Sequence, residues 1–145
     1  MNSFFSKKCE YGLQAVLYIA AQDDNYVCPV EEISSKLNIP KEFTSKILQN
    51  LTESGIIESR KGKSGGFKIA KETTQIKLID IVEAIDGVEI FNKCVMGFTN
   101  CTQDKKCLLH EEWQEIIIKA QDMLSRDTID HFRMQMLDQI LFQSI

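Results

Sequence analysis

The chain has 145 residues and a mass of 16.6 kDa, the size of a single domain. Its 43% hydrophobic and 26% charged residues exclude an intrinsically disordered chain, and its net charge of −4 argues against a protein that coats nucleic acid indiscriminately. No apolar run approaches the roughly 18 residues of a transmembrane helix, so we expect no membrane partner.

The five cysteines are an odd number and cannot all pair with one another. Lys7 and Lys8 lead into an amphipathic segment, which is not the pattern of a secretory signal peptide. We therefore expect a cytoplasmic protein, in which cysteines are more often metal ligands or reactive thiols than bridges.

Charge is distributed unevenly along the chain. Residues 1–75 contain 10 basic and 9 acidic residues, a net charge of +1, whereas residues 76–145 contain 7 and 12, a net charge of −5. Residues 60–71 contain five basic residues and no acidic one. Such a cluster creates a local positive potential, although by itself it is equally typical of a solvated loop.

Apolar residues at helical spacing predict three helices in the first half, over residues 7–22, 30–37 and 41–54. Ser6 is placed to cap the first helix, and Pro29 stands where a second helix would start. Residues 38–40 form a turn, and Gly55 follows the third helix in the position of a left-handed cap.

Two short strands are predicted next, over residues 56–60 and 67–69, joined by a glycine-rich basic tip. Helix, helix, turn, helix and hairpin is the order of a winged helix-turn-helix, so residues 1–75 are predicted to form a DNA-binding region. In that fold one helix enters the major groove and the wing contacts the DNA backbone or minor groove.

The second half, residues 76–145, is predicted to be helical. A helix spans residues 76–85, a long loop spans residues 87–107, and two further helices begin near Leu108 and after Asp127. The apolar stripe after Leu108 is wider than one core contact requires, which predicts a dimerisation region, unless these helices only cover the core of the monomer. The fold class is thus mainly α with a small β-hairpin wing, in one compact unit.

The long loop contains the main chemical motif of the sequence. Cys94, Cys101 and Cys107 have the spacing C-x6-C-x5-C, and His110 follows three residues later. Zinc accepts three thiolates and an imidazole in a tetrahedral site, and iron–sulfur clusters accept thiolates with imidazole replacement. Both groups remain possible at this point, as does reversible thiol oxidation without metal.

Other readings of the cysteines are weaker. Cys9 and Cys28 are typical of small buried apolar residues. A thiol enzyme would need a base and an oxyanion site beside its nucleophile, and beyond Cys107 and His110 no such group is evident. A small electron carrier would leave the basic wing unexplained.

Four motifs together resemble the Rrf-type winged-helix transcription regulators, the bacterial family of IscR-like and NsrR-like iron–sulfur regulators. In addition to the cysteine loop, the resemblance rests on EYGLQA at residues 10–15, IPKEF at 39–43, SKILQNL at 45–51 and RKGKSGGF at 60–67. The resemblance covers nearly the whole length and implies a homodimeric DNA-binding regulator, reading a palindromic operator on double-stranded DNA. It also implies that the protein is not an enzyme.

The resemblance implies an iron–sulfur cluster on Cys94, Cys101 and Cys107. His110 matches the fourth ligand of the 2Fe–2S type, which is favoured, whereas a 4Fe–4S cluster would take a carboxylate from the first helix of the partner subunit, near the position of Glu10. Six residues separate the first two cysteines where the family has five. The resemblance further implies contacts to DNA from the start of the third helix and from the wing, at Lys41, Glu42, Phe43, Ser45, Lys46, Arg60, Lys61, Lys63, Ser64 and Gly65.

Overall fold

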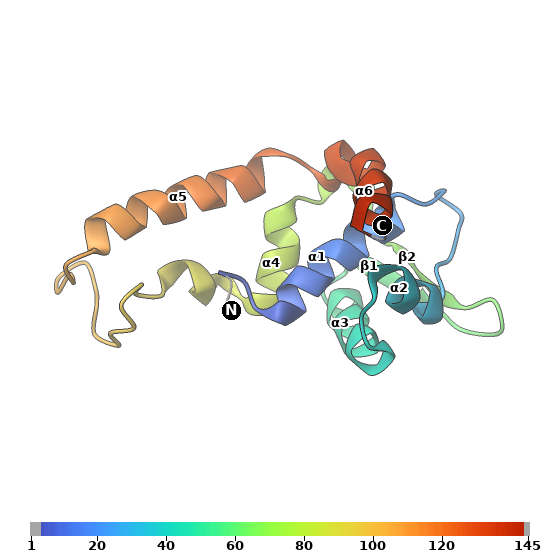
Figure 1. Cartoon of the computed structure of the whole chain (residues 1–145), viewed down its shortest axis with the longest axis horizontal. Coiled ribbons are helices and arrows are strands. Elements are labelled where there is room, and N and C mark those ends of the chain that lie inside the picture. Colours follow the sequence, from blue (N-terminus) through green and yellow to red (C-terminus); the bar gives the residue numbers. More distant parts are fainter. Residues whose placement is uncertain (1–3, 144–145) are drawn as a thin grey trace.

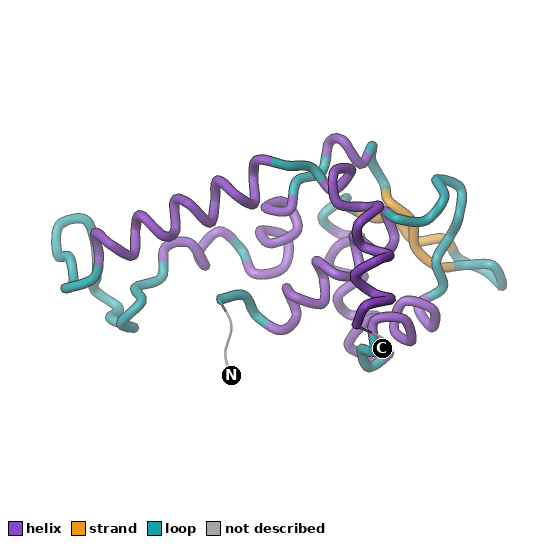
Figure 2. The backbone as a smooth tube through the Cα atoms, turned by 45° about the horizontal axis from the view of Figure 1, so that its top comes forward, coloured by secondary structure: helices purple, strands orange, loops and turns teal. Residues whose placement is uncertain are grey.

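The chain folds into helices with one antiparallel hairpin, as the sequence predicts (Figures 1 and 2). The computed structural model describes residues 4–143, without the side chains of residues 137 and 140–143. The elements are α1 (Lys7–Ala20), α2 (Val30–Leu37), α3 (Lys41–Glu53), β1 (Ile57–Arg60), β2 (Gly66–Ile69), the 3-10 helix η1 (Thr73–Gln75), α4 (Leu78–Asp86), the 3-10 helix η2 (Val88–Asn92), α5 (His110–Arg126) and α6 (Ile129–Gln143).

Local signals set the ends of the first three helices. The Ser6 hydroxyl accepts a hydrogen bond from the Cys9 amide at 3.0 Å and so caps α1. Asn38 ends α2 in the left-handed conformation, with φ of 55°, and Gly55 follows α3 with φ of 81°. These ends confirm the predicted turn between α2 and α3 and the predicted glycine cap.

The hairpin is joined to the helices by a third piece of extended chain. Within the hairpin, Ser59 of β1 pairs with Phe67 of β2. Cys28, just before α2, exchanges two backbone hydrogen bonds of 2.8 Å with Phe67 on the outer side of β2. At Gly66, a Cβ atom would lie 2.2 Å from the Cys28 carbonyl oxygen, so only glycine permits this approach. The wing is thereby fixed to the start of α2.

Two adjoining groups of buried side chains form the core. The larger group packs α1, α2 and α3 against the base of the wing, with Val16, Ile33 and Leu48 each fully buried. The smaller group lies between α4, η2 and α5 and includes Val82 and Ile117. Three partly buried residues pack against both groups: Leu13, Leu78 and Ile85. The two halves of the chain therefore share continuous packing through α1 and α4.

The second half differs from the sequence prediction in three boundaries. The helix predicted from residue 76 begins at Leu78, because Ile76 is extended and accepts a hydrogen bond of 2.7 Å from the Ile129 amide. The predicted loop contains η2 at its start. Helix α5 begins at His110 rather than Leu108, whose side chain is 91% exposed. None of the helices in the described part of the chain has the length and apolar character needed to span a membrane.

Candidate metal centre and nucleic-acid interface

The start of α3 presents charged side chains to solvent, as expected for a recognition helix. Lys41, Glu42 and Lys46 are all exposed. The Lys41 ammonium group lies 2.8 Å from the carboxylate of Glu31 on α2, and this hydrogen bond lowers the pKa of Glu31. Lys41 is thus paired within the protein, whereas Lys46 has no ion pair among the interactions that the structure describes.

Phe43 and Ser45 lie on less exposed sides of α3. The Phe43 ring packs edge-on against Tyr11 of α1, with ring centroids 5.6 Å apart, and contributes to the larger core group. Ser45 is half-buried. Phe43 therefore anchors the start of α3 to α1, a contact that holds the helix at a fixed angle.

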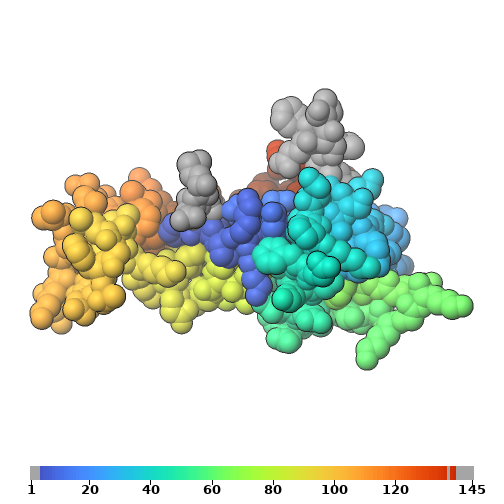
Figure 3. All heavy atoms as spheres, turned by 60° about the horizontal axis from the view of Figure 1, so that its bottom comes forward, coloured from blue at the N-terminus to red at the C-terminus, as the bar shows by residue number. Residues whose placement is uncertain are grey.

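The wing carries its charge at the tip. Arg60 lies within 3.4 Å of Glu58 on the same strand, so part of its charge is neutralised locally. Gly65 is half-buried. Its backbone lies close to that of Arg60, because a Cβ atom added at Gly65 would be 2.4 Å from the Arg60 carbonyl oxygen. The exposed tip consists of Lys61, Gly62, Lys63 and Ser64. Figure 3 shows this tip as a projection at one end of the molecule.

The loop before α5 lies at the opposite end of the molecule from the wing (Figures 1 and 3), and its three cysteines meet there. The sulfurs of Cys94, Cys101 and Cys107 all lie within 4.8 Å of one another, and those of Cys94 and Cys107 are 3.6 Å apart. His110, at the start of α5, joins this group through its Nδ1 atom, 3.3 Å from the Cys101 sulfur. The structure thus brings together the four residues that the sequence singles out.

Hydrogen bonding differentiates the thiols. Partial burial acts to raise the pKa of Cys94, but amides of residues 98 and 96 and the neighbouring thiols outweigh it, so the pKa of Cys94 is lowered. At Cys101 the Cys107 amide acts to lower the pKa, and burial together with the two other thiols outweighs it, so the pKa of Cys101 is raised. Cys94 is therefore the readiest of this pair to ionise and bind a cation.

The donor set fits a metal or an iron–sulfur cluster. Three thiols with one imidazole are ligands for zinc and for iron. The His110 Nε2 atom is buried and has no hydrogen-bond partner in the described part of the chain. Buried polar atoms are normally paired, so this nitrogen calls for a partner that the described protein groups do not supply. Glu10 is not a member of this group; it lies in the first turn of α1, where it pairs with Lys7 at 3.7 Å.

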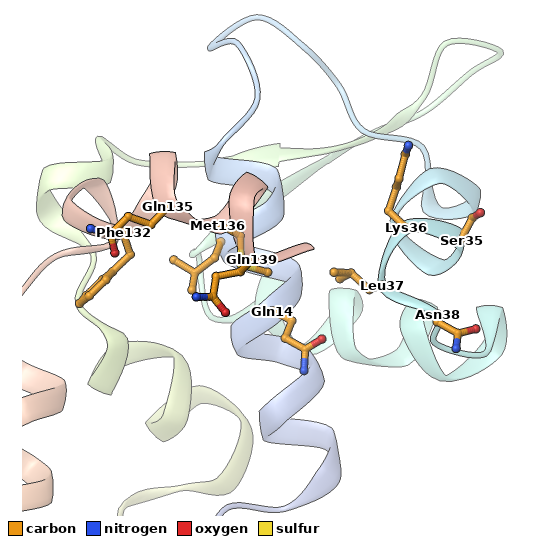
Figure 4. A pocket seen from close by; sticks show the side chains of 10 residues that line it. Gln14, Ser35, Lys36, Leu37, Asn38, Phe132, Gln135, Met136 and Gln139 are labelled. Atoms are coloured by element: carbon orange, nitrogen blue, oxygen red, sulfur yellow. The ribbon is translucent and has the colours of Figure 1, made fainter. Parts of the chain in front are cut away.

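Trp113 borders the cysteines, although the sequence marks it only as one apolar residue of the α5 stripe. It lines the small cavity of about 20 Å³ formed by the three cysteines and His110. Its spacing of three residues from His110, on the same side of one helix, is the signal that places it there. A much larger groove of about 810 Å³ lies elsewhere, between α1, α2 and α6 (Figure 4), and none of its lining residues is a predicted site residue.

Comparison with known proteins identifies the family. Residues 5–133 match the family Rrf2, described as iron-dependent transcriptional regulators. The chain belongs to the Rrf2 family. It is 34% identical over 127 residues to a protein of Aquifex aeolicus named as an HTH-type transcriptional regulator, covering 86% of this chain and 88% of that one. It is 24% identical over 125 residues to the regulator IscR of Pectobacterium atrosepticum, covering 86% and 76%.

Solved structures of Rrf2 regulators share the fold. CymR, the global cysteine regulator of B. subtilis, superposes with a TM-score of 0.74 at 20% identity, covering 92% of this chain and 97% of CymR. IscR of T. potens gives a TM-score of 0.69 at 18% identity, covering 96% and 88%. The winged-helix fold and the role of a DNA-binding transcription regulator are therefore confirmed, and relatives of this Rrf2 chain are regulators rather than enzymes.

Proposed function

We propose that this Rrf2 regulator senses iron–sulfur status, redox state or nitric oxide through an iron–sulfur cluster. Cys94, Cys101 and Cys107 would hold the cluster, with His110 as fourth ligand. The observation that carries the proposal is the convergence of these four side chains in a chain whose family is described as iron-dependent. A bound cluster supplies a redox-active group whose gain or loss reorders the loop over residues 87–107.

The cluster is tested by anaerobic purification and reconstitution, with quantification of iron, sulfide and zinc and an absorption spectrum. Cys94→Ala removes a proposed ligand. Cys28→Ala is the matched control, because Cys28 is buried in the larger core group and is not part of the cysteine loop. We expect iron and sulfide in the wild type and in Cys28→Ala and their loss in Cys94→Ala. A colourless wild type after reconstitution, or unchanged iron in Cys94→Ala, would falsify the proposal.

The close approach of the sulfurs also fits a second candidate, a cluster-free regulator of the same fold. Two thiolates on one tetrahedral zinc, with bonds of about 2.3 Å, lie roughly 3.8 Å apart, close to the 3.6 Å between Cys94 and Cys107. The same pair can form a disulfide: peroxide takes two electrons and two protons from the two thiols and leaves as two water molecules. Stoichiometric zinc, or a loss of two hydrogens on peroxide treatment, identifies these forms.

We also propose that the protein acts in the cytoplasm as a homodimer, with residues 76–145 as the dimerisation region. On α5, Ile116 and Met123 are two turns apart on one side of the helix and each is more than half exposed, while Ile118 is exposed on the other side. Phe98 and Leu108 of the cysteine loop are exposed as well. Pairing two such faces would bury them, and two-fold symmetry suits a palindromic operator. Ile116→Glu should convert the protein to a monomer in sedimentation analysis, whereas Ile118→Glu, the same change on the other side of the helix, should not.

The DNA contacts complete the proposal. The start of α3 would reach base edges through Glu42, Ser45 and Lys46, and the wing would contact phosphates. Phe43, packed on Tyr11, would support the helix from its inner side. Support comes from the exposure of the charged residues and from the position of α3 after the turn. Footprinting on the DNA upstream of the protein's own gene, with cluster-loaded and metal-free protein, should protect two half-sites one helical turn or a multiple of it apart.

A further inference from the structure

Trp113 bridges the cysteine loop and helix α5. Its indole N–H donates a hydrogen bond of 3.1 Å to the carbonyl oxygen of Lys93, the residue immediately before Cys94. It stands one helical turn after His110. The backbone that carries the first cysteine is thus held by a side chain of the helix that carries the histidine.

The other side of the Trp113 ring meets the segment that leads into α1. Phe4 packs edge-on against Trp113, with ring centroids 6.0 Å apart, and also contacts Phe91 of η2 at 6.3 Å. Phe4 and Phe5 pack edge-on at 5.1 Å. These rings form an aromatic cluster, Phe4, Phe5, Phe91 and Trp113, which joins the cysteine loop to the chain end next to α1.

Hydrogen bonds then tie the aromatic cluster to the DNA-binding region. Ser6, directly after the two phenylalanines, caps α1 and donates its backbone N–H to the Asp86 carboxylate at 3.0 Å. Asp86 is the last residue of α4, next to η2. Helix α1 in turn packs against α3. Contacts therefore run without a break from the residue before Cys94 to the recognition helix.

We propose that Trp113 is a positioning residue for the cysteine centre and the point at which that centre is coupled to α1. Its N–H holds the backbone before Cys94 in place. Its ring packs against Phe4, so a movement of the loop would displace Phe4 and, through it, the Ser6 cap of α1. The inference rests on the proposed metal binding. The two functions of Trp113 are separable, because the N–H bond faces the loop and the ring faces Phe4.

The first test uses Co²⁺ as the probe, titrated anaerobically into the reduced full-length protein, with thiolate absorption bands as the signal. Trp113→Phe keeps an aromatic ring and removes the donor, and Gln114→Ala is the control, because Gln114 borders the same cavity and no described hydrogen bond joins it to the loop. We expect Trp113→Phe to bind Co²⁺ about five- to tenfold more weakly, with shifted bands, and Gln114→Ala to match the wild type. Equal affinity and spectrum for Trp113→Phe would overturn the positioning role.

A metal-free measurement separates failure of this inference from failure of the proposed function. If wild-type protein does not take up Co²⁺, metal binding fails, and the role of Trp113 is decided by the rate at which a chromogenic disulfide modifies Cys94 in protein that also carries Cys101→Ser and Cys107→Ser. Faster modification in Trp113→Phe than in wild type, at unchanged circular dichroism, supports positioning, and equal rates refute it. For the coupling, Phe4→Leu retains the indole donor, so Co²⁺ affinity should persist while Co²⁺ no longer changes DNA affinity. Retained coupling in Phe4→Leu would refute that half.

Discussion

The replacement Gly66→Ala tests whether the wing is fixed to the protein through Cys28. Gly66 begins β2, and its backbone lies directly under the Cys28 carbonyl. A Cβ atom would stand 2.2 Å from that oxygen, with both partners in backbone rather than in a flexible side chain. Restoring an ordinary carbon–oxygen distance of about 3.3 Å requires the backbone at Cys28 and the backbone of β2 to move apart by roughly 1 Å.

That separation removes both hydrogen bonds between Cys28 and Phe67. They measure 2.8 Å, and about 3.8 Å is beyond hydrogen-bonding range. Each bond contributes about 0.5–1.5 kcal/mol net, and more where the groups left unpaired are buried, as they are at Cys28, which is fully buried. Adding about 1–2 kcal/mol for an L-residue at positive φ, we expect Gly66→Ala to lower the free energy of unfolding by about 3–5 kcal/mol.

Gly62→Ala is the matched control. Gly62 lies at the wing tip with φ of 107°, and a Cβ atom there meets nothing within 4 Å. It should therefore show only the backbone cost of about 1–2 kcal/mol. Urea unfolding followed by circular dichroism measures both variants. A Gly66→Ala protein within about 0.5 kcal/mol of Gly62→Ala, inside the usual scatter of such comparisons, would refute the role assigned to the Cys28 bridge.

Four further outcomes follow from the geometry. Burial raises the pKa of both Cys9 and Cys28 to about 12, so iodoacetamide at pH 8 should label three cysteines in native metal-free protein and five in urea. Because these thiols ionise more readily when unfolded, their contribution to stability should fall as the pH rises above the model-peptide value near 9, by about 1.4 kcal/mol per thiol at pH 10; a flat unfolding free energy between pH 8 and 10 would contradict this. Lys61→Ala should reduce the slope of log affinity against log salt by about one on all DNA sequences, and an unchanged slope would remove Lys61 from the phosphate contacts. Ser6→Ala deletes the hydroxyl that caps α1 and donates to Asp86, while the backbone N–H bond to Asp86 remains. Thermal unfolding should therefore show a loss of about 1–2 kcal/mol, whereas an unchanged melting temperature would show that the cap is dispensable.

The winged-helix region was predictable because its signals are local. Ser6, Asn38 and Gly55 each act on backbone within a few residues, and the alternation of helix and turn follows the chain. The hairpin likewise pairs neighbouring segments. By contrast, Cys28 was recognisable in sequence only as a small buried residue, since its pairing with Phe67 joins positions far apart in the chain.

The candidate metal centre was predictable in its ligands and not in its support. Four metal-binding side chains within 17 residues are an unusual density, so the cysteines and His110 stand out by spacing alone. Trp113 does not, because its partner Lys93 is 20 positions away and is contacted through a backbone carbonyl, which carries no side-chain signature. A periodicity that places Trp113 on an apolar stripe cannot show which backbone group its N–H will meet.

Under the proposed coupling, a signal from the cysteine end reaches the wing end through α1. The buried side of this helix packs with Cys9 in the smaller core group near its start and, two turns further along, with Val16 in the larger one. Between them Gly12 meets Ile85 of α4 so closely that an added Cβ atom would lie 2.1 Å from its Cδ1 atom. Packing of this density is not continuously deformable, so a change at the loop is expected to move α1 as a rigid body rather than to be absorbed along it. Since Phe43 rests on α1 through Tyr11, such a movement would alter the angle at which α3 meets DNA.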